Sequence, residues 1–280
     1  MRADAIDRSA WPPLPAPHEA FLEPALVKLQ GDARLVGVAA AGSFARAAAD
    51  EHSDIDLVVA VEPAHIGDVL RDRNGIAQSL GPLLVAFTGE HVGEPRLLVC
   101  LYGPPLLHVD LNFVALPDAA HRVDECVVLW EREGRLSATL ATERAVYPAP
   151  DLQWIEDRIW TWVHYLAGKI ARGELFETLD GLGYVRARVL GPLALQLEGA
   201  QPNGLRRVES AAPGYVDALR ATVAAHDSAS CTRALHATVA LYRELRERSA
   251  NVTLTRCSAA EAESLLFLDR IDTRRAGGSQ

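Results

Sequence analysis

Short runs rich in valine and leucine recur through the first half of the chain and predict strands. They cover Leu35 to Ala40, Asp56 to Val61, Leu83 to Phe87, Arg96 to Tyr102, Leu106 to Val114 and Cys126 to Trp130. Between them, the segments Phe21 to Gln30 and Pro63 to Leu80 have helical spacing. The tight link Gly103-Pro104-Pro105 predicts that the fourth and fifth strands are antiparallel neighbours. We therefore expect a domain with a mixed sheet.

The second half of the chain has a helical pattern instead. Apolar residues follow one another at intervals of 3 or 4 at Leu152, Ile155, Ile159, Val163, Leu166 and Ile170. A last helix is expected to begin at Ser258, because Ser258 and Glu261 form the S-x-x-E pattern of a capping box. The two prolines in Tyr147 to Pro150 mark the break between the halves.

These patterns together predict an α+β fold in two domains. A mixed-sheet catalytic domain is expected over residues 1–148, an all-α helical bundle over residues 151–272, and a flexible tail over residues 273–280.

Composition narrows the class of partner. The 280 residues are 49% hydrophobic and 23% charged, with a formal net charge of -9. This acidic balance argues against a nucleic-acid partner, which draws on clustered Lys and Arg. Four widely spaced cysteines, in no CxxC arrangement, predict neither a zinc site nor a disulfide framework. They are Cys100, Cys126, Cys231 and Cys257.

The chain offers no membrane-spanning run. No stretch approaches the roughly 20 apolar residues that a spanning helix needs. The segment Met1 to Ala16 lacks the apolar core of a signal peptide. We therefore expect a cytoplasmic protein without a membrane partner.

A glycine-serine turn and two aspartates supply the first candidate chemistry. Gly42 lacks a Cβ, so the backbone can turn tightly there and approach a ligand. Ser43 offers a hydroxyl and a backbone N–H to a phosphate oxygen. Asp54 and Asp56 stand two apart at the start of a strand, so both carboxylates project from one face. Paired carboxylates invite a hard divalent cation such as Mg²⁺.

A third aspartate strengthens the case for a metal site. Alternation through Leu107 to Phe113 puts His108, Asp110 and Asn112 on one strand face. If this strand neighbours the one that begins at Asp56, three carboxylates converge and could hold two metal ions about 3.5 to 4 Å apart.

This arrangement resembles the nucleotidyltransferase superfamily that is similar to DNA polymerase β. The aminoglycoside and lincosamide nucleotidyltransferases belong to that superfamily. The resemblance covers about residues 33 to 130 and rests on Gly42-Ser43, Asp54-Ile55-Asp56 and Asp110. It implies a mixed-sheet catalytic core, ATP or another nucleoside triphosphate as donor, and two Mg²⁺ ions.

The resemblance also implies a role for each matching residue. Gly42 and Ser43 would bind the triphosphate, and Asp54 and Asp56 would bind metal. Asp110 would bind the second metal and help to deprotonate the acceptor hydroxyl.

Two basic residues are further candidates for binding phosphate. Many antibiotic-modifying relatives carry a basic residue directly after the serine, whereas this chain has Phe44. Arg46 could still reach a phosphate, or it could be a solvated helix charge. On the helix from Asp151 to Arg172, Lys169 lies on a basic and aromatic face with Trp154 and Tyr165. If that face lines a cleft, Lys169 could neutralise the leaving pyrophosphate.

The expected activity is transfer of a nucleoside monophosphate, AMP from ATP, to a hydroxyl of a small molecule. An aminoglycoside or lincosamide antibiotic is the best-known kind of acceptor in the family that it resembles. The alternatives are a protein-adenylylating enzyme like those of toxin and antitoxin pairs, or a non-catalytic nucleotide-binding relative. The sequence leaves open the acceptor, the nucleotide and the formation of a homodimer.

Overall fold

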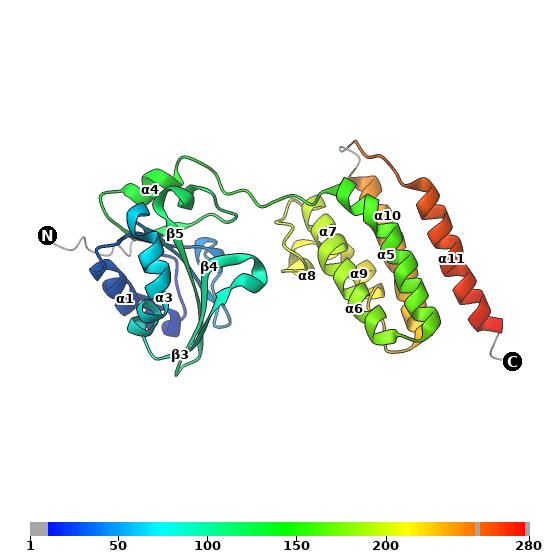
Figure 1. The fold of residues 1–280 in the computed structure, drawn as a ribbon, viewed down its shortest axis with the longest axis horizontal. Coiled ribbons are helices and arrows are strands. Elements are labelled where there is room, and N and C mark those ends of the chain that lie inside the picture. Colours follow the sequence, from blue (N-terminus) through cyan, green and yellow to red (C-terminus); the bar gives the residue numbers. More distant parts are fainter. Residues whose placement is uncertain (1–10, 250–252, 278–280) are drawn as a thin grey trace. The chain divides into compact units, whose positions relative to one another are not determined.

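The structure, a computed structural model, describes residues 11–249 and 253–277. The chain folds into two compact units, Met1–Tyr147 and Pro148–Gln280. Figure 1 shows a sheet with helices against it in the first unit, and helices packed along one another in the second. The α+β fold predicted from the two kinds of hydrophobic spacing is confirmed.

The first unit is built on a six-stranded sheet with the order β3-β4-β5-β2-β1-β6. The strands are β1 (Leu35–Ala40), β2 (Ile55–Val61), β3 (Leu83–Gly89), β4 (Glu94–Tyr102), β5 (Leu107–Ala115) and β6 (Val127–Glu131). Strands β2 and β5 are parallel, and every other neighbouring pair is antiparallel. The mixed sheet and the antiparallel β4–β5 pair therefore agree with the prediction.

Helices cover one face of this sheet fully and the other face in part. The helical segments are α1 (Ala16–Gly31), α2 (Gly42–Ala45), η1 (Pro63–His65), α3 (Ile66–Leu80), η2 (Glu90–Val92), η3 (Leu116–Ala120) and α4 (Arg135–Leu140). Apolar side chains of α1 and α3 join those of the central strands in the larger core. On the other face, η3 and α4 pack over Ala60 and Val114, near the far ends of β2 and β5. The starts of β2 and β5 lie outside that smaller cluster.

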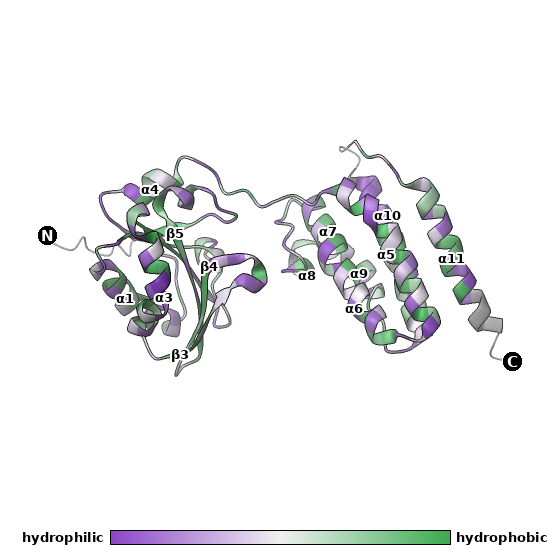
Figure 2. Ribbon diagram, viewed as in Figure 1, coloured by the Kyte–Doolittle hydropathy of each residue, from purple (hydrophilic) through white to green (hydrophobic). Residues whose placement is uncertain are grey.

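The described part of the second unit is helical. Its segments are α5 (Leu152–Arg172), α6 (Leu175–Val185), η4 (Arg186–Leu190), α7 (Gly191–Leu197), α8 (Val208–Ala211), η5 (Pro213–Tyr215), α9 (Val216–Ala221), α10 (Ser228–Arg248) and α11 (Ser258–Gly277). Figure 2 shows hydrophobic and hydrophilic residues interspersed along each of these helices. None of the helices within the described residues is long and apolar enough to cross a membrane.

The predicted apolar stripe of α5 lies in the core of this unit. All six of its members are at most 5% exposed, namely Leu152, Ile155, Ile159, Val163, Leu166 and Ile170. Asp151 caps the helix, because its carboxylate accepts a hydrogen bond from the backbone N–H of Trp154. The 3.6-residue period of the sequence is therefore enough to place this helix.

Glu156 breaks the apolar pattern of α5, since its charged side chain is fully buried. It accepts hydrogen bonds from the side chains of Trp160, Tyr242 and Arg246 and from the backbone N–H of Cys257. A buried carboxylate is costly unless it is paired and hydrogen-bonded. Arg246 supplies the charge that compensates it.

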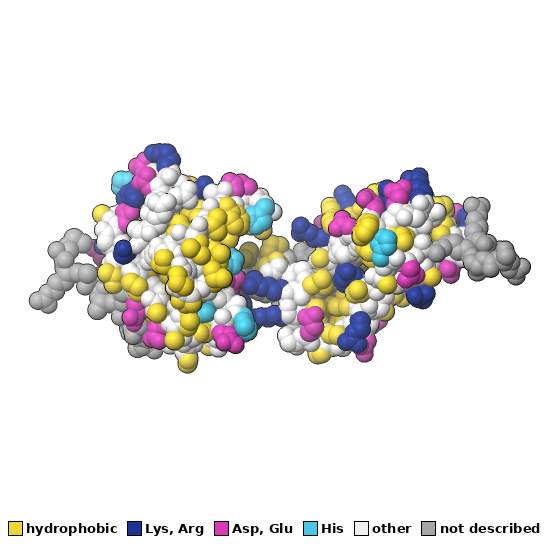
Figure 3. Space-filling model, turned by 90° about the horizontal axis from the view of Figure 1, so that it is seen from below, with side chains coloured by type: hydrophobic (Ala, Val, Ile, Leu, Met, Phe, Trp, Pro, Cys, Tyr) yellow, Lys and Arg dark blue, Asp and Glu magenta, His cyan; other side chains and the backbone are white. Residues whose placement is uncertain are grey.

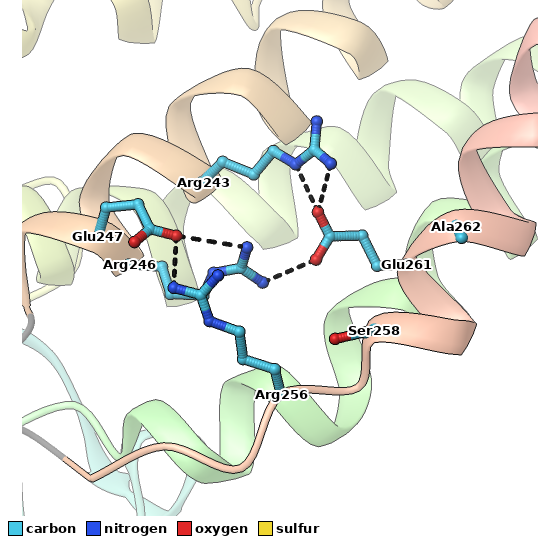
Figure 4. A pocket seen from close by; sticks show the side chains of 7 residues that line it. All are labelled: Arg243, Arg246, Glu247, Arg256, Ser258, Glu261 and Ala262. Carbon is cyan, nitrogen blue, oxygen red and sulfur yellow. Dashed lines mark hydrogen bonds and ion pairs between the residues drawn. The ribbon is translucent and has the colours of Figure 1, made fainter.

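Arg246 extends this network from α10 to the start of α11. Its guanidinium also donates to Glu261 at 2.9 Å, and Arg243 donates to the other oxygen of the same carboxylate. Figure 4 shows these contacts beside a second pair, Arg256 with Glu247. The hollow of about 460 Å³ that these residues line is thus walled by paired charges.

Helix α11 begins at Ser258, the predicted start, but it ends later than expected. The tail predicted from residue 273 is helical as far as Gly277, because Arg and Ala, which occupy all of residues 274–276, are good helix formers. Residues 278–280 lie outside the described residues.

We expect Arg246→Leu to lower the free energy of unfolding of the helical unit by about 3–5 kcal/mol, since it leaves the Glu156 carboxylate buried without a cation. Chemical denaturation followed by circular dichroism measures this. The matched control is Arg220→Leu, which removes a side chain that is 73% exposed and paired with Asp217. The control should change stability by less than about 1 kcal/mol. Similar losses in both variants would contradict the role of Arg246.

The network also predicts how stability depends on pH. Burial alone would raise the pKa of Glu156, but the hydrogen bonds from Tyr242, Trp160, Cys257 and Arg246 outweigh it, so the pKa lies below its usual value of 4.5. A carboxyl whose pKa is lower in the folded than in the unfolded state stabilises the fold at pH values above its unfolded-state pKa. That contribution is lost as the pH falls through the folded-state pKa. Below pH 4.5, the denaturant concentration at the midpoint of unfolding should decrease with falling pH less steeply in Glu156→Gln than in the natural chain. If the unfolding midpoints of both chains change with pH in parallel, Glu156 does not contribute to the pH dependence of stability.

Candidate active site

The parallel pairing of β2 with β5 places two of the predicted aspartates side by side. Asp56 is the register partner of Asp110. Neighbouring strands lie about 4.8 Å apart, and register partners project from the same face. The side chain of Asp110 is 22% exposed. Two partly exposed carboxylates therefore stand next to each other where the starts of β2 and β5 meet.

Asp54, the third predicted carboxylate, lies just before β2 and two residues from Asp56. The loop that carries it is tied to α1, because the ring of His18 hydrogen-bonds the carbonyl of Ser53 at 2.7 Å. His18 is itself buried, so this contact fixes the entry of the chain into β2. No local sequence pattern marks this role of His18, since its partner is 35 residues away.

Gly42 lies so close to the Asp56 carboxylate that any side chain there would have to displace it. Its φ is +60°, and a Cβ built on it would lie 2.0 Å from Asp56 Oδ2. The backbone N–H of Ala41, one residue earlier, donates to the carbonyl of Asp56 at 2.9 Å. The predicted turn is therefore held directly against the predicted metal ligand.

Ser43 sits at this turn with its hydroxyl buried. It is 6% exposed, and its Oγ has no hydrogen-bond partner among the described residues. The next residue, Phe44, is buried in the larger core and packs edge-on against Trp11, with ring centroids 6.0 Å apart. An apolar side chain therefore stands after the serine because it anchors the turn. A buried, unsatisfied hydroxyl is costly, which indicates a missing partner.

Two neighbours on β5 complete the polar face around Asp110. The ring of His108 lies 3.0 Å from Asp110 Oδ1, as alternation along the strand predicts. Asn112 Oδ1 is buried and makes no hydrogen bond within the part of the chain that the structure describes. Alternation indicated the face of Asn112, but only the structure reveals its unsatisfied oxygen.

Arg46 follows α2 and lies beside an acid that the sequence did not single out. Its guanidinium is 3.4 Å from Asp124 Oδ1. Asp124 stands in the loop before β6, where no periodic pattern marks it. A partly exposed pair of this kind is weak and can exchange one acid for another anion. The phosphate role of Arg46 stays a prediction.

Lys169 belongs to the second unit and has partners there. Its ammonium donates to Glu174 and lies 5.0 Å from the centroid of the Tyr165 ring. The hydrogen bond with Glu174 raises the pKa of Lys169, so the side chain is charged at neutral pH. The proposed contact of Lys169 with pyrophosphate stays a prediction.

The residues present suit a magnesium ion that is shared with a phosphate ligand. Within residues 11–249 and 253–277, no group of three or more His, Cys, Asp or Glu side chains is placed to hold a metal alone. Mg²⁺ usually takes one or two carboxylates, with water and substrate phosphates filling its other positions. Asp56 and Asp110 offer that number of hard oxygen donors, beside the unsatisfied hydroxyl of Ser43.

Cysteine chemistry is not favoured near these carboxylates. All four cysteines are free thiols. Burial raises the pKa of Cys126 to about 11 and that of Cys100 to about 12. Both thiols are therefore protonated at neutral pH, whereas a nucleophilic cysteine needs its thiolate.

Comparison with known proteins yields only distant similarities. No protein-family model matches the chain, and no curated protein matches it significantly. The chain is similar to a solved aminoglycoside 6-adenyltransferase from Bacillus subtilis, with 13% identity and a TM-score of 0.41 over 88% of this chain and 95% of that one. It is also similar to a nucleotidyltransferase-like protein from Exiguobacterium sibiricum, with 14% identity and a TM-score of 0.35 over 83% and 73% of the two chains.

We expect Gly42→Ala to disrupt the site, because the new methyl would need a left-handed backbone and would collide with the Asp56 carboxylate. The strain and displacement should cost about 1–3 kcal/mol of stability, measured by thermal denaturation. Isothermal titration should show weaker binding of Mg²⁺ with ATP.

Gly168→Ala is the matched control for this glycine. Gly168 lies within α5, and a Cβ there would meet no atom within 4 Å. Alanine should therefore stabilise the helix slightly. If Gly42→Ala changes neither the melting temperature nor the binding of Mg²⁺ with ATP, the close contact between residue 42 and the Asp56 carboxylate is not required for stability or binding.

Proposed function

We propose that this protein is a magnesium-dependent nucleotidyltransferase. It would transfer a nucleoside monophosphate, AMP from ATP, to a hydroxyl group of a small molecule. The observation that carries the proposal is the pairing of Asp56 with Asp110 on parallel strands, with the Gly42 turn held against Asp56. Paired carboxylates next to a tight glycine-serine turn suit a metal-bound triphosphate.

Ser43 and the backbone around it would bind the triphosphate. The unsatisfied Oγ of Ser43 would donate to a phosphate oxygen and so gain the partner that it lacks. Gly42 has no side chain to keep a phosphate away from the backbone. Arg46 and Lys169 are proposed as further contacts of the nucleotide.

Asp54, Asp56 and Asp110 would hold the magnesium, as two ions when the triphosphate is bound. Bound Mg²⁺ neutralises charge on phosphate oxygens and orients the attacking and leaving oxygens. The protein's own contribution is to fix the position of its carboxylates. The β2–β5 register and the link from His18 to Ser53 do this without any ligand.

The reaction is a single displacement at phosphorus. The acceptor oxygen forms a bond to the α-phosphorus, while the bond from that phosphorus to the oxygen bridging to the β-phosphate breaks. Pyrophosphate leaves with the electron pair of that bond. The hydroxyl proton passes to the Asp110 carboxylate and then to water, which makes Asp110 the general base.

We expect Asp56→Asn and Asp110→Asn each to lower the rate of transfer at least about 10²-fold, because each removes charge from the metal site or the base. The assay combines pyrophosphate release with mass spectrometry of the products. It uses ATP and the other nucleoside triphosphates, Mg²⁺ and a panel of alcohols that includes aminoglycosides and lincosamides.

The control for these substitutions is Asp118→Asn. Asp118 lies in η3, is half exposed and faces Arg96 at 3.6 Å, and it is no member of the β2–β5 register that pairs Asp56 with Asp110. This variant should keep full activity. The proposal fails if no acceptor gains a nucleotide, or if Asp110→Asn transfers as fast as the natural chain.

A further inference from the structure

An apolar strip lies next to the paired carboxylates on the same face of the sheet. In the β4–β5 register, Val99 is the partner of Asp110, and in the β3–β4 register Phe87 is the partner of Val99. Asp56, Asp110, Val99 and Phe87 therefore form one row across four strands. Register partners in neighbouring strands project from the same face.

The row belongs to a larger strip of exposed or half-buried side chains. We define the apolar strip as residues of β3 and β4 that alternate with core positions, namely Val85, Phe87, Leu97, Val99 and Leu101. Val85 is 51% exposed and Phe87 is 50% exposed, although the ring of His91 packs 5.6 Å from that of Phe87. The alternate positions on β4, Cys100 among them, point into the larger core.

Neighbouring apolar side chains that are left open on one face of a protein often mark a binding site. On the side seen in Figure 3, hydrophobic side chains gather in a broad group on the first unit, whereas both kinds of charge are interspersed over the second. A strand that serves only as an outer layer of a sheet would carry polar residues on its open face. Each position of the strip is instead Val, Leu or Phe.

The order of the strands shows which substrate the strip would contact. Gly42 and Ser43 follow β1, which lies on one side of β2, whereas β5, β4 and β3 lie on the other side. The triphosphate end of the site and the apolar strip are thus separated by the carboxylates. Because the attacking and leaving oxygens lie roughly in line through the phosphorus, the acceptor approaches from the side opposite the leaving pyrophosphate.

We propose that the acceptor of this protein carries an apolar group beside its reacting hydroxyl, and that the apolar strip binds that group. The inference rests on the proposed nucleotidyl transfer and specifies its substrate class. Val99 is one strand from Asp110, about 4.8 Å, and Phe87 is about twice as far, so an apolar group a few carbons from the hydroxyl would cover both. A polycationic sugar would find no acidic side chain among the five positions of the strip.

The test compares two acceptors that differ only in their apolar part. Methyl and hexyl β-glucoside offer the same hydroxyls, and the hexyl compound is used below its micelle concentration. Each is incubated with ATP, Mg²⁺ and the full chain, and kcat/KM is obtained from pyrophosphate release and from the mass of the adduct. We expect the hexyl compound to be preferred at least about tenfold, as an apolar contact of several methylenes predicts.

The variant Phe87→Thr/Val99→Thr keeps β-forming residues on the strands and removes the apolar contact. It should lose the preference for the hexyl compound, seen as a fall of the ratio of the two kcat/KM values towards one. The control is Val27→Thr, which changes a 60% exposed apolar residue on α1, the helix on the other face of the sheet. This control should retain the preference.

The outcomes separate the inference from the proposed function. Equal use of both glucosides, or a preference that survives in the double variant, overturns the apolar acceptor site but leaves nucleotidyl transfer standing. A double variant that melts earlier yet keeps the preference shows that the strip only packs within the protein, which also overturns the inference. If no acceptor gains a nucleotide and no pyrophosphate is released, both proposals fall.

Discussion

The parallel register between β2 and β5 is the constraint on which the site depends. It sets two carboxylates one strand spacing apart, where two negative charges repel each other. The strands cannot slip to relieve this repulsion, because a shift by one residue would turn the buried side chains of both strands out of the larger core. The hydrophobic interior thus holds the acidic pair together, and the glycine turn closes against it from the β1 side.

The sequence predicts those parts of the fold and site that depend on local periodicity. Alternation places His108, Asp110 and Asn112 on one face, and the structure agrees that His108 contacts Asp110. Register cannot be read in the same way, since it arises from pairing between segments far apart in the chain. For that reason the sequence predicts the Asp56–Asp110 pair only on the condition that their strands are neighbours. It does not predict the row that continues through Val99 to Phe87.

Partners of charged side chains were the least predictable feature, for a related physical reason. Arg46 and Lys169 were identified by residue type and position, but their partners Asp124 and Glu174 depend on how loops and helix ends come together. Glu177, near the same helix end, accepts a hydrogen bond from Tyr165. Long polar side chains find the nearest opposite charge, and the sequence alone does not define that distance.

The buried Glu156 carries a consequence for how the chain matures. Its guanidinium partner comes 90 residues later and its backbone donor 101 residues later, near the end of the chain. During synthesis the first unit can complete its sheet while the second still lacks the groups that neutralise its interior charge, because N-terminal segments emerge and fold first. Arg246 on α10 and the backbone N–H of Cys257, just before α11, supply these groups. Until Arg246 has been made, the second unit therefore cannot bury Glu156 without the cost of an unpaired charge.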